Sequence, residues 1–262
     1  QQVGNKTSFT DRSTDVNVLT YTYKIVAVNA QGQSQPSNII SLTVGPRPPT
    51  TGACAIPGIQ LFTDPVGDAS DTNAQHDITS ISVAEPLDNA TTGSASKIYF
   101  TIKVANLNTP IQPGWRWSIR FTVPGFTPPD YQVLNQTIPQ EDWQVSMDTS
   151  DGPTPVFTYG TTGVVQGAAR FFVTRGNLDP ASNANPDGTI TLVLPKSVFP
   201  NIQPGTPINI ALASVRATAP SVVPGTGGTN ETIPDTTQPG TYVLRPANLC
   251  LPNTAPLAVL TG

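Results

Sequence analysis

The chain has 262 residues, of which 28 are proline and 21 are glycine, and only 11% carry a charge. Strand-forming and turn-forming residues dominate, so the composition predicts an all-β protein rather than one built from long helices. The net charge is −4, which disfavours nucleic acid as a partner because phosphate binding needs clustered Lys and Arg. No apolar run is long enough to cross a membrane.

Two strands are predicted near the start of the chain. The sequence LTYTYKIVAVN at positions 19–29 alternates between apolar and polar residues, which indicates a strand with one buried face. A turn follows, and IISLTV at positions 39–44 forms the second predicted strand. A few strands alone are only marginally stable, so this piece is expected to lean on the next domain or on a partner chain.

The first predicted strand resembles the penultimate strand of a fibronectin type III domain. That strand typically carries Tyr, Tyr, Val, Ala and Asn at alternate positions, followed by Gly and Ser. The matching residues are Tyr21, Tyr23, Ile25, Ala27, Asn29, Gly32 and Ser34. The resemblance implies the C-terminal half of an immunoglobulin-like sandwich over residues 1–45.

Residues 46–52 form a proline-rich linker, and a longer β-patterned domain follows over residues 53–251. Its short β segments are separated by Pro, Gly, Asn and Asp, which predicts an antiparallel two-sheet β-sandwich. Short helical turns are expected only at positions 195–199 and 139–143. The expected strands are Ile56–Phe62, Ile78–Glu85, Lys97–Val104, Trp115–Val123, Asp142–Met147, Val156–Tyr159, Ala169–Thr174, Thr189–Leu194, Ile208–Arg216 and Thr241–Leu244.

Cys54 and Cys250 are the only cysteines, and they flank this domain. A disulfide between them would enclose 195 residues (250 − 54 − 1) and remove roughly 5 kcal/mol of unfolded-state freedom on the chain-entropy model. Such a bond persists in oxidising compartments, so the pair predicts an extracellular or cell-surface protein. The alternative is two unrelated buried thiols.

An acidic stretch connects the first two strands of this domain. Calcium takes six to eight oxygen ligands, and turns rich in Asp supply both carboxylates and backbone carbonyls. The stretch therefore predicts a calcium site, with Asp64, Asp68 and Asp77 as the first candidates. In the alternative interpretation, these residues cap the amides of their own turns. The candidate metal ligands are Asp64, Asp68, Asp71, Asp77 and Glu85.

The same stretch resembles a β-sandwich module of secreted bacterial multidomain proteins, which are often subtilisin-like peptidases. The matching residues are Asp64, Pro65, Gly67, Asp68, Asp77, Ile78, Val83, Glu85 and Pro86. The resemblance implies a fold related to DOMON-like and family 9 carbohydrate-binding sandwiches, and an accessory rather than a catalytic role. Residues 252–262 resemble a linker or the first strand of a PKD-type domain.

The residue inventory argues against catalysis. His76 is the only histidine and lies in a polar loop, and no nucleophile motif accompanies it. Two tryptophans, Trp115 and Trp143, are candidate ligand-binding residues, because exposed aromatic rings can stack on sugars. Trp117 alternates with Ile119 and Phe121 and is predicted to belong to the core.

We therefore expect a non-catalytic extracellular module that serves as a spacer, adhesion or substrate-docking segment of a larger exported protein, such as a secreted hydrolase. The alternatives are a structural subunit of an extracellular filament or surface layer, and a carbohydrate-binding module. The expected partners are neighbouring domains or chains, a polysaccharide or a protein surface.

Overall fold

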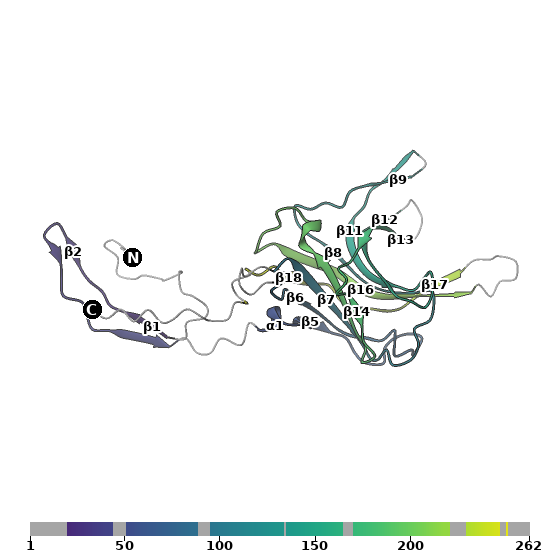
Figure 1. The fold of residues 1–262 in the computed structure, drawn as a ribbon, viewed down its shortest axis with the longest axis horizontal. Coiled ribbons are helices and arrows are strands. Elements are labelled where there is room, and N and C mark those ends of the chain that lie inside the picture. Colours follow the sequence, from purple (N-terminus) through teal and green to yellow (C-terminus); the bar gives the residue numbers. More distant parts are fainter. Residues whose placement is uncertain are drawn as a thin grey trace. The chain divides into compact units, whose positions relative to one another are not determined.

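The structure is a computed structural model that describes residues 20–43, 51–88, 95–133, 135–164, 170–220, 229–246 and 250. The chain divides into two units, which are described separately below (Figure 1). The first unit comprises residues 1–50 and 252–262, and the second comprises residues 51–251. Of the linker predicted at 46–52, residues 46–50 lie outside the described residues, as does the stretch 252–262, whereas Thr51 and Gly52 begin a short helix.

In the first unit, residues 20–43 form two small antiparallel pairs of strands. Strand β1 pairs with β4, and the short strands β2 and β3 form a hairpin. The strand expected at 19–29 is thus interrupted, because the amides of Ile25 and Ala27 bond to the hydroxyls of Ser37 and Ser34. The bounds are Thr20–Tyr23 for β1, Val28–Asn29 for β2, Gly32–Gln33 for β3 and Ile40–Thr43 for β4.

The second unit is an antiparallel β-sandwich of two sheets, as the sequence predicted. A five-stranded sheet has the order β14-β15-β7-β6-β5, with bounds Asn183–Ala184, Thr189–Pro195, Lys97–Val104, Ile78–Ala84 and Ile59–Thr63. A seven-stranded sheet has the order β13-β12-β11-β8-β16-β17, and β18 also pairs with β16. Its bounds, in that order, are Arg170–Asn177, Val156–Val164, Asp142–Asp148, Trp115–Thr122, Pro207–Pro220, Thr229–Thr236 and, for β18, Gly240–Val243.

The remaining elements are short. They are helix α1 (Thr51–Cys54), the 3₁₀ turn η1 (Lys196–Val198) and the hairpin of β9 (Tyr131–Val133) and β10 (Gln136–Ile138). Across the described part of the chain, no helix combines the length and apolar character that a membrane crossing requires.

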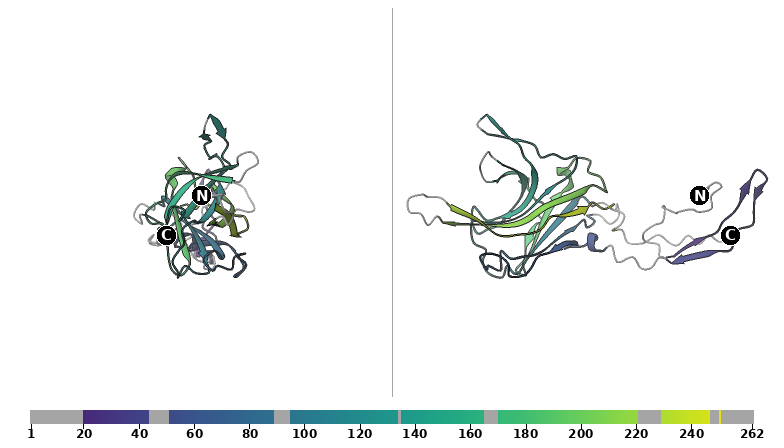
Figure 2. Two further views of the ribbon diagram at one scale, coloured as in Figure 1. Left: turned by 90° about the vertical axis from the view of Figure 1, so that its right-hand side faces the viewer. Right: turned by 180° about the vertical axis from the view of Figure 1, so that it is seen from behind.

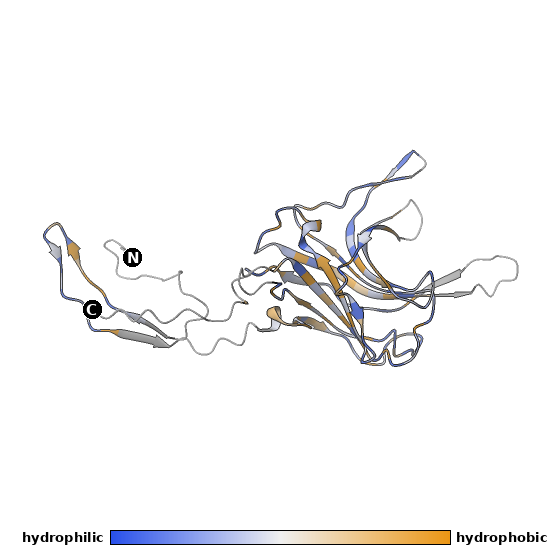
Figure 3. Cartoon of the chain, in the orientation of Figure 1, coloured by the Kyte–Doolittle hydropathy of each residue, from blue (hydrophilic) through white to orange (hydrophobic). Residues whose placement is uncertain are grey.

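The core lies between the two sheets and follows the alternation read from the sequence. In β8, the side chains of Trp117, Ile119 and Phe121 are all at most 1% exposed. The ring of Phe121 stacks on that of Phe100 from the other sheet, with ring centroids 5.2 Å apart. Hydrophobic residues are accordingly banded along the strands (Figure 3). This interdigitation of two apolar faces is what an antiparallel sandwich requires.

The seven-stranded sheet is curved, and its concave face points away from the five-stranded sheet (Figures 1 and 2). Register shifts interrupt its pairing between Tyr159 and Gly160 and between Ile210 and Leu212. An extra residue of this kind bends a strand and increases its twist. The second face of this sheet is therefore recessed rather than flat.

Every strand that the sequence predicted in this domain overlaps an observed strand, but some elements were missed. Strand β17 was not expected, although it continues the hairpin of β16. The turn expected at 195–199 contains η1, whereas 139–143 is not helical. There Gln140 is buried and its Oε1 accepts a hydrogen bond from the Thr161 hydroxyl, and β11 begins at Asp142.

The predicted disulfide between Cys54 and Cys250 is present, with the two Cα atoms 5.3 Å apart. It joins α1, at the beginning of the second unit, to the end of that unit. Next to it, the amide of Glu85 donates to the carbonyl of Ala53 at 2.6 Å and fastens α1 to the end of β6. The chain therefore enters and leaves the sandwich at one point.

Replacing both cysteines by serine should lower the free energy of unfolding by up to about 5 kcal/mol, because the unfolded chain regains the freedom of a long loop. Urea unfolding of the oxidised wild type and the double variant measures the difference. Equal unfolding midpoints, or two free thiols in the unreduced wild type by mass spectrometry, would contradict the pairing.

Candidate functional site

The loop between β5 and β6 contains four of the five candidate metal ligands and is fastened at several points. Gly67 has a φ of 86°, which a side chain would disfavour, and its amide donates to Asp77 Oδ2 at 2.8 Å. The amide of Ser70 donates to the carbonyl of Pro234 at 2.9 Å. The loop thus folds back on itself and against β17 of the other sheet.

Three carboxylates meet where this loop contacts β17. One oxygen each from Asp64, Asp68 and Asp235 lies within 4.8 Å of the other two. Asp68 is exposed, Asp64 is half-buried and Asp235 is 7% exposed. Asp235 is held in place because its Oδ2 accepts a hydrogen bond of 2.7 Å from the amide of Ile78.

Asp77, which lies in the same loop as Asp64 and Asp68, adds a fourth carboxylate to these three. Its side chain is buried, and its Oδ1 has no hydrogen-bond partner; the same holds for Oδ2 of Asp64. A buried polar atom without a partner costs free energy, more so when it carries charge. Within the described residues, no Lys or Arg pairs with any of these four carboxylates.

The pKa values of two of these acids are raised above their ordinary range. Burial, followed by the charges of Asp64 and Asp68, raises the pKa of Asp235 to about 6. Burial also raises the pKa of Asp64, with smaller contributions from Asp68 and Asp77. The described residues therefore concentrate negative charge here, and none of their Lys or Arg side chains balances it.

The donor set determines which ion could bind. Carboxylate oxygens are the ligands of hard cations such as calcium and magnesium, whereas zinc sites typically use Cys and His. Asp64, Asp68 and Asp235 could each supply one ligand atom, and Asp77 lies in the same loop.

Asp71 belongs to a different local arrangement. Its Oδ2 lies 2.6 Å from Nδ1 of His76, and its Oδ1 accepts from the amide of Asn73. Asp71 therefore makes the turn-capping contacts that the sequence analysis gave as the alternative to metal binding. Asp71 thus lies outside the cluster of Asp64, Asp68 and Asp235.

The expectation that Glu85 is a metal ligand is wrong, because its carboxylate has other partners. It is 1% exposed, and Oε1 accepts from the Tyr242 hydroxyl at 2.8 Å and from the Arg245 amide at 2.7 Å. Oε2 forms an ion pair of 2.6 Å with Nζ of Lys196. Burial, and then the charge of Glu85, raises the pKa of Tyr242.

His76 lies in the loop between β5 and β6, as the sequence predicted, but its side chain is buried. It is 2% exposed, and its ring meets that of Trp115 edge-on with centroids 4.2 Å apart. Trp115 is half-buried, and its ring also contacts that of Trp117 at 5.8 Å. Trp115 therefore packs against His76 of the loop between β5 and β6, and its ring is not presented alone to a ligand.

Trp143 was expected as a ligand-binding residue, and its burial corrects that expectation. It is 8% exposed, and its ring packs edge-on against Phe199 with centroids 5.1 Å apart. Its Nε1 donates to the carbonyl of Phe126 at 2.8 Å. An indole that is almost fully buried and whose donor is already bonded belongs to the core.

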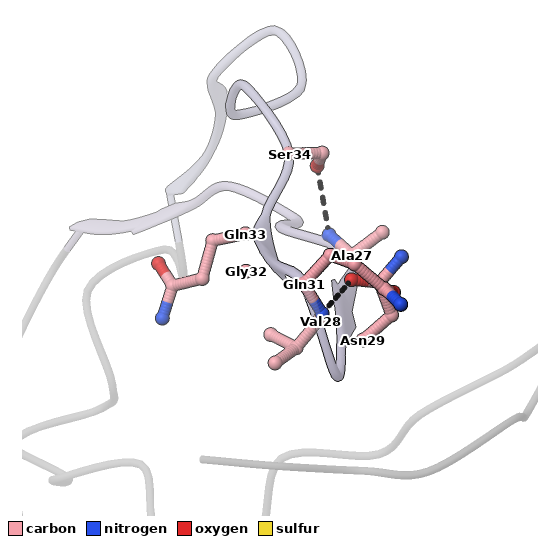
Figure 4. A pocket seen from close by; sticks show the side chains of 7 residues that line it. All are labelled: Ala27, Val28, Asn29, Gln31, Gly32, Gln33 and Ser34. Atoms are coloured by element: carbon pink, nitrogen blue, oxygen red, sulfur yellow. Dashed lines mark hydrogen bonds between the residues drawn. The ribbon is translucent and has the colours of Figure 1, made fainter.

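A shallow hollow in the first unit lies at the β2–β3 hairpin (Figure 4). The Ser34 hydroxyl accepts from the Ala27 amide, and Asn29 Oδ1 accepts from the Gln31 amide. No charged side chain lines it, and the Ser34 hydroxyl and Asn29 Oδ1 already bond within the hairpin. The lining residues are Ala27, Val28, Asn29, Gln31, Gly32, Gln33 and Ser34.

Asp235 is the cluster residue that sequence reasoning missed as a ligand. It lies 157 residues from its hydrogen-bond partner Ile78, and only the pairing of β17 with β16 brings it to the loop. No motif near Asp235 in the sequence indicates a metal ligand. Comparisons with protein-family models, with curated proteins and with solved structures found no match, so the geometry carries the argument.

Asp235→Asn should change the pH dependence of stability in chelator. The folded chain holds the Asp235 proton more tightly than the unfolded chain, so wild-type stability falls as pH rises from about 4 to 7. Asn keeps an acceptor for the Ile78 amide but does not titrate. Relative to wild type, the variant should gain up to about 3 kcal/mol over this range.

Urea unfolding at several pH values in chelator measures this difference. A constant difference between the two proteins from about pH 4 to 7 would show that Asp235 titrates normally in the folded chain, and would contradict the account.

Glu85→Gln should lower the free energy of unfolding by about 2 to 4 kcal/mol, because it leaves Lys196 without its buried partner. The amide can still accept from Tyr242 and Arg245, so the local shape is retained. Any shift of the melting temperature by calcium should be the same as in wild type, since Glu85 lies apart from the carboxylate cluster. Loss of that shift in Glu85→Gln would return Glu85 to the set of ligands.

Proposed function

We propose that the chain is a non-catalytic extracellular docking module of a larger exported protein. The observation that carries the proposal is the Cys54–Cys250 disulfide, which needs an oxidising compartment and holds the two ends of the sandwich together. A domain that the chain enters and leaves at one point adds little to the distance between its neighbours. Among the roles of spacer, adhesion and docking segment, this arrangement favours docking and adhesion.

The placement of His76 supports a role without catalysis. The only imidazole in the chain is 2% exposed, and its Nδ1 pairs with Asp71. A general base must come within hydrogen-bond reach of a substrate, which this ring does not offer to solvent. Both cysteines are consumed by the disulfide, so neither can act as a nucleophile.

The module is further proposed to bind calcium through Asp64, Asp68 and Asp235, with Asp77 beside them. The proposal rests on the convergence of these carboxylates, on the buried oxygens of Asp64 and Asp77 that lack partners, and on the lack of a described cationic side chain to neutralise them. A bound dication would supply the missing charge and fix the loop between β5 and β6 against β17.

Calcium should raise the melting temperature of the chain relative to chelator, because a ligand that binds only the folded state stabilises it. At a hundredfold excess over Kd the gain is about 2.7 kcal/mol. Asp68→Asn should reduce or abolish the shift. The matched control is Asp151→Asn, which removes an equally exposed acid from another turn and should keep the shift.

Identical melting of the wild type with calcium and with chelator would contradict the calcium proposal. So would an equal loss of the shift in Asp68→Asn and Asp151→Asn, because a general charge effect would then explain it.

The docking role is tested by assaying the purified chain against peptide, ester and glycoside panels and by sedimentation with cellulose, chitin and protein fibres. We expect no turnover and retention on at least one polymer. Turnover that a single Asp or Glu substitution abolishes would overturn the non-catalytic assignment. Ordered self-association without retention on any polymer would overturn the docking role in favour of a filament or surface-layer subunit.

A further inference from the structure

The disulfide encloses every strand that the structure describes in the second unit. The first of these strands, β5, begins at Ile59, and the last, β18, ends at Val243. Cys54 precedes the first strand and Cys250 follows the last, and their Cα atoms are 5.3 Å apart although 196 positions separate them in the chain. A pull on the chain outside this bridge therefore passes from one cysteine to the other without crossing either sheet.

The bridge holds back a long stretch of chain. An extended chain spans about 3.3–3.6 Å per residue, so the 196 steps from Cys54 to Cys250 would reach about 650–700 Å. The disulfide fixes the same two positions at 5.3 Å. While it is intact, the ends of the second unit cannot separate, whether the sandwich is folded or unfolded.

The sandwich alone is poorly arranged to resist such a pull. Strand β5 is the last strand of the five-stranded sheet, and β18 pairs with β16 in the other sheet. A load would enter β5 at Ile59 and β18 at Val243, both at the end of the sandwich that carries α1 (Figure 1). Ladder bonds run perpendicular to antiparallel strands, so a strand drawn away from its loaded end loses them one after another.

A shear arrangement would be stronger, because many ladder bonds then carry the load together. It requires that the two loaded strands pair with each other and are pulled from opposite ends. Strands β5 and β18 belong to different sheets and are loaded at the same end. The topology thus leaves resistance to tension to the contacts at this end.

Non-covalent contacts at this end converge on Glu85. Its amide donates to the carbonyl of Ala53 at 2.6 Å, on the segment that enters the sandwich. Its Oε1 accepts from the Tyr242 hydroxyl at 2.8 Å and from the Arg245 amide at 2.7 Å, on the segment that leaves it. Without the disulfide, these hydrogen bonds would be loaded first, and forced unfolding would proceed at the rate at which they open.

We propose that the Cys54–Cys250 disulfide is a mechanical bypass, which carries tension along the chain past the second unit and leaves both of its sheets unloaded. The carboxylate cluster of Asp64, Asp68 and Asp235 then keeps its geometry while the chain is stretched. A chain that attaches one object to another bears such tension, so the bypass suits an adhesion or docking segment. It depends on neither calcium nor a polymer ligand.

Single-molecule force spectroscopy of the full chain, with handles at positions 1 and 262, tests the proposal. The oxidised wild type should show no long extension step. Both cysteines are only half-buried, so a dithiol can reach the bridge, reduce it to two thiols and leave as a cyclic disulfide. The same molecules should then gain a further extension of about 650–700 Å under the same load.

The variants separate the bypass from ordinary stability. Cys54→Ser with Cys250→Ser should extend by the same length without a dithiol. The matched control is Glu85→Gln, which also lowers the free energy of unfolding but keeps the bridge. It should show no long step until the dithiol is added, because resistance follows the disulfide rather than the stability of the fold.

A long step in the oxidised wild type, or in oxidised Glu85→Gln, would overturn the inference. So would a reduced wild type that resists the load as well as the oxidised chain, because the sandwich itself would then bear the tension. If the double-serine variant is unfolded before it is pulled, the comparison of one wild-type molecule before and after the dithiol still decides. Failure of calcium or polymer binding would count against the proposed function and leave this result unchanged.

Discussion

Two buried carboxylates fasten the two sheets of the sandwich at opposite ends of β6, and the rest of the second unit depends on these links. At the end of the strand, Glu85 accepts from the hydroxyl of Tyr242 in β18 of the other sheet. At its beginning, the amide of Ile78 donates to Asp235 in β17 of that sheet. Each link joins residues 157 positions apart, so neither forms until both sheets are in place.

The two links differ in how their charge is balanced. Glu85 has Lys196 at 2.6 Å and lies where the chain closes through the disulfide, so its buried charge is neutralised by the protein itself. Asp235 lies instead among further carboxylates, and no Lys or Arg of the described residues pairs with them. A buried carboxylate costs free energy unless a cation pairs with it or a proton neutralises it, and the calcium proposed at Asp235 would supply the cation.

The same geometry explains which features could be predicted from the sequence and which could not. Alternation identified β7 and β8 because strand periodicity is local, and the position of Cys54 and Cys250 at the domain ends was enough to predict their bond. The role of Glu85 and the contribution of Asp235 could not be found in this way, because each depends on which strand of the other sheet lies opposite. Trp143 was misjudged for the same reason: its packing partner, Phe199, lies in another segment.

The cation proposed at the Asp235 cluster would balance the negative charge of its carboxylates. Isothermal titration of the chelator-treated chain with calcium tests it most directly, with Asp235→Asn and Asp71→Asn titrated alongside. We expect one calcium bound per chain and at least tenfold weaker binding (roughly 1.4 kcal/mol) in Asp235→Asn. Binding should be unchanged in Asp71→Asn, because Asp71 pairs with His76. No binding to the wild type, or equal affinity in Asp235→Asn, would contradict the claim.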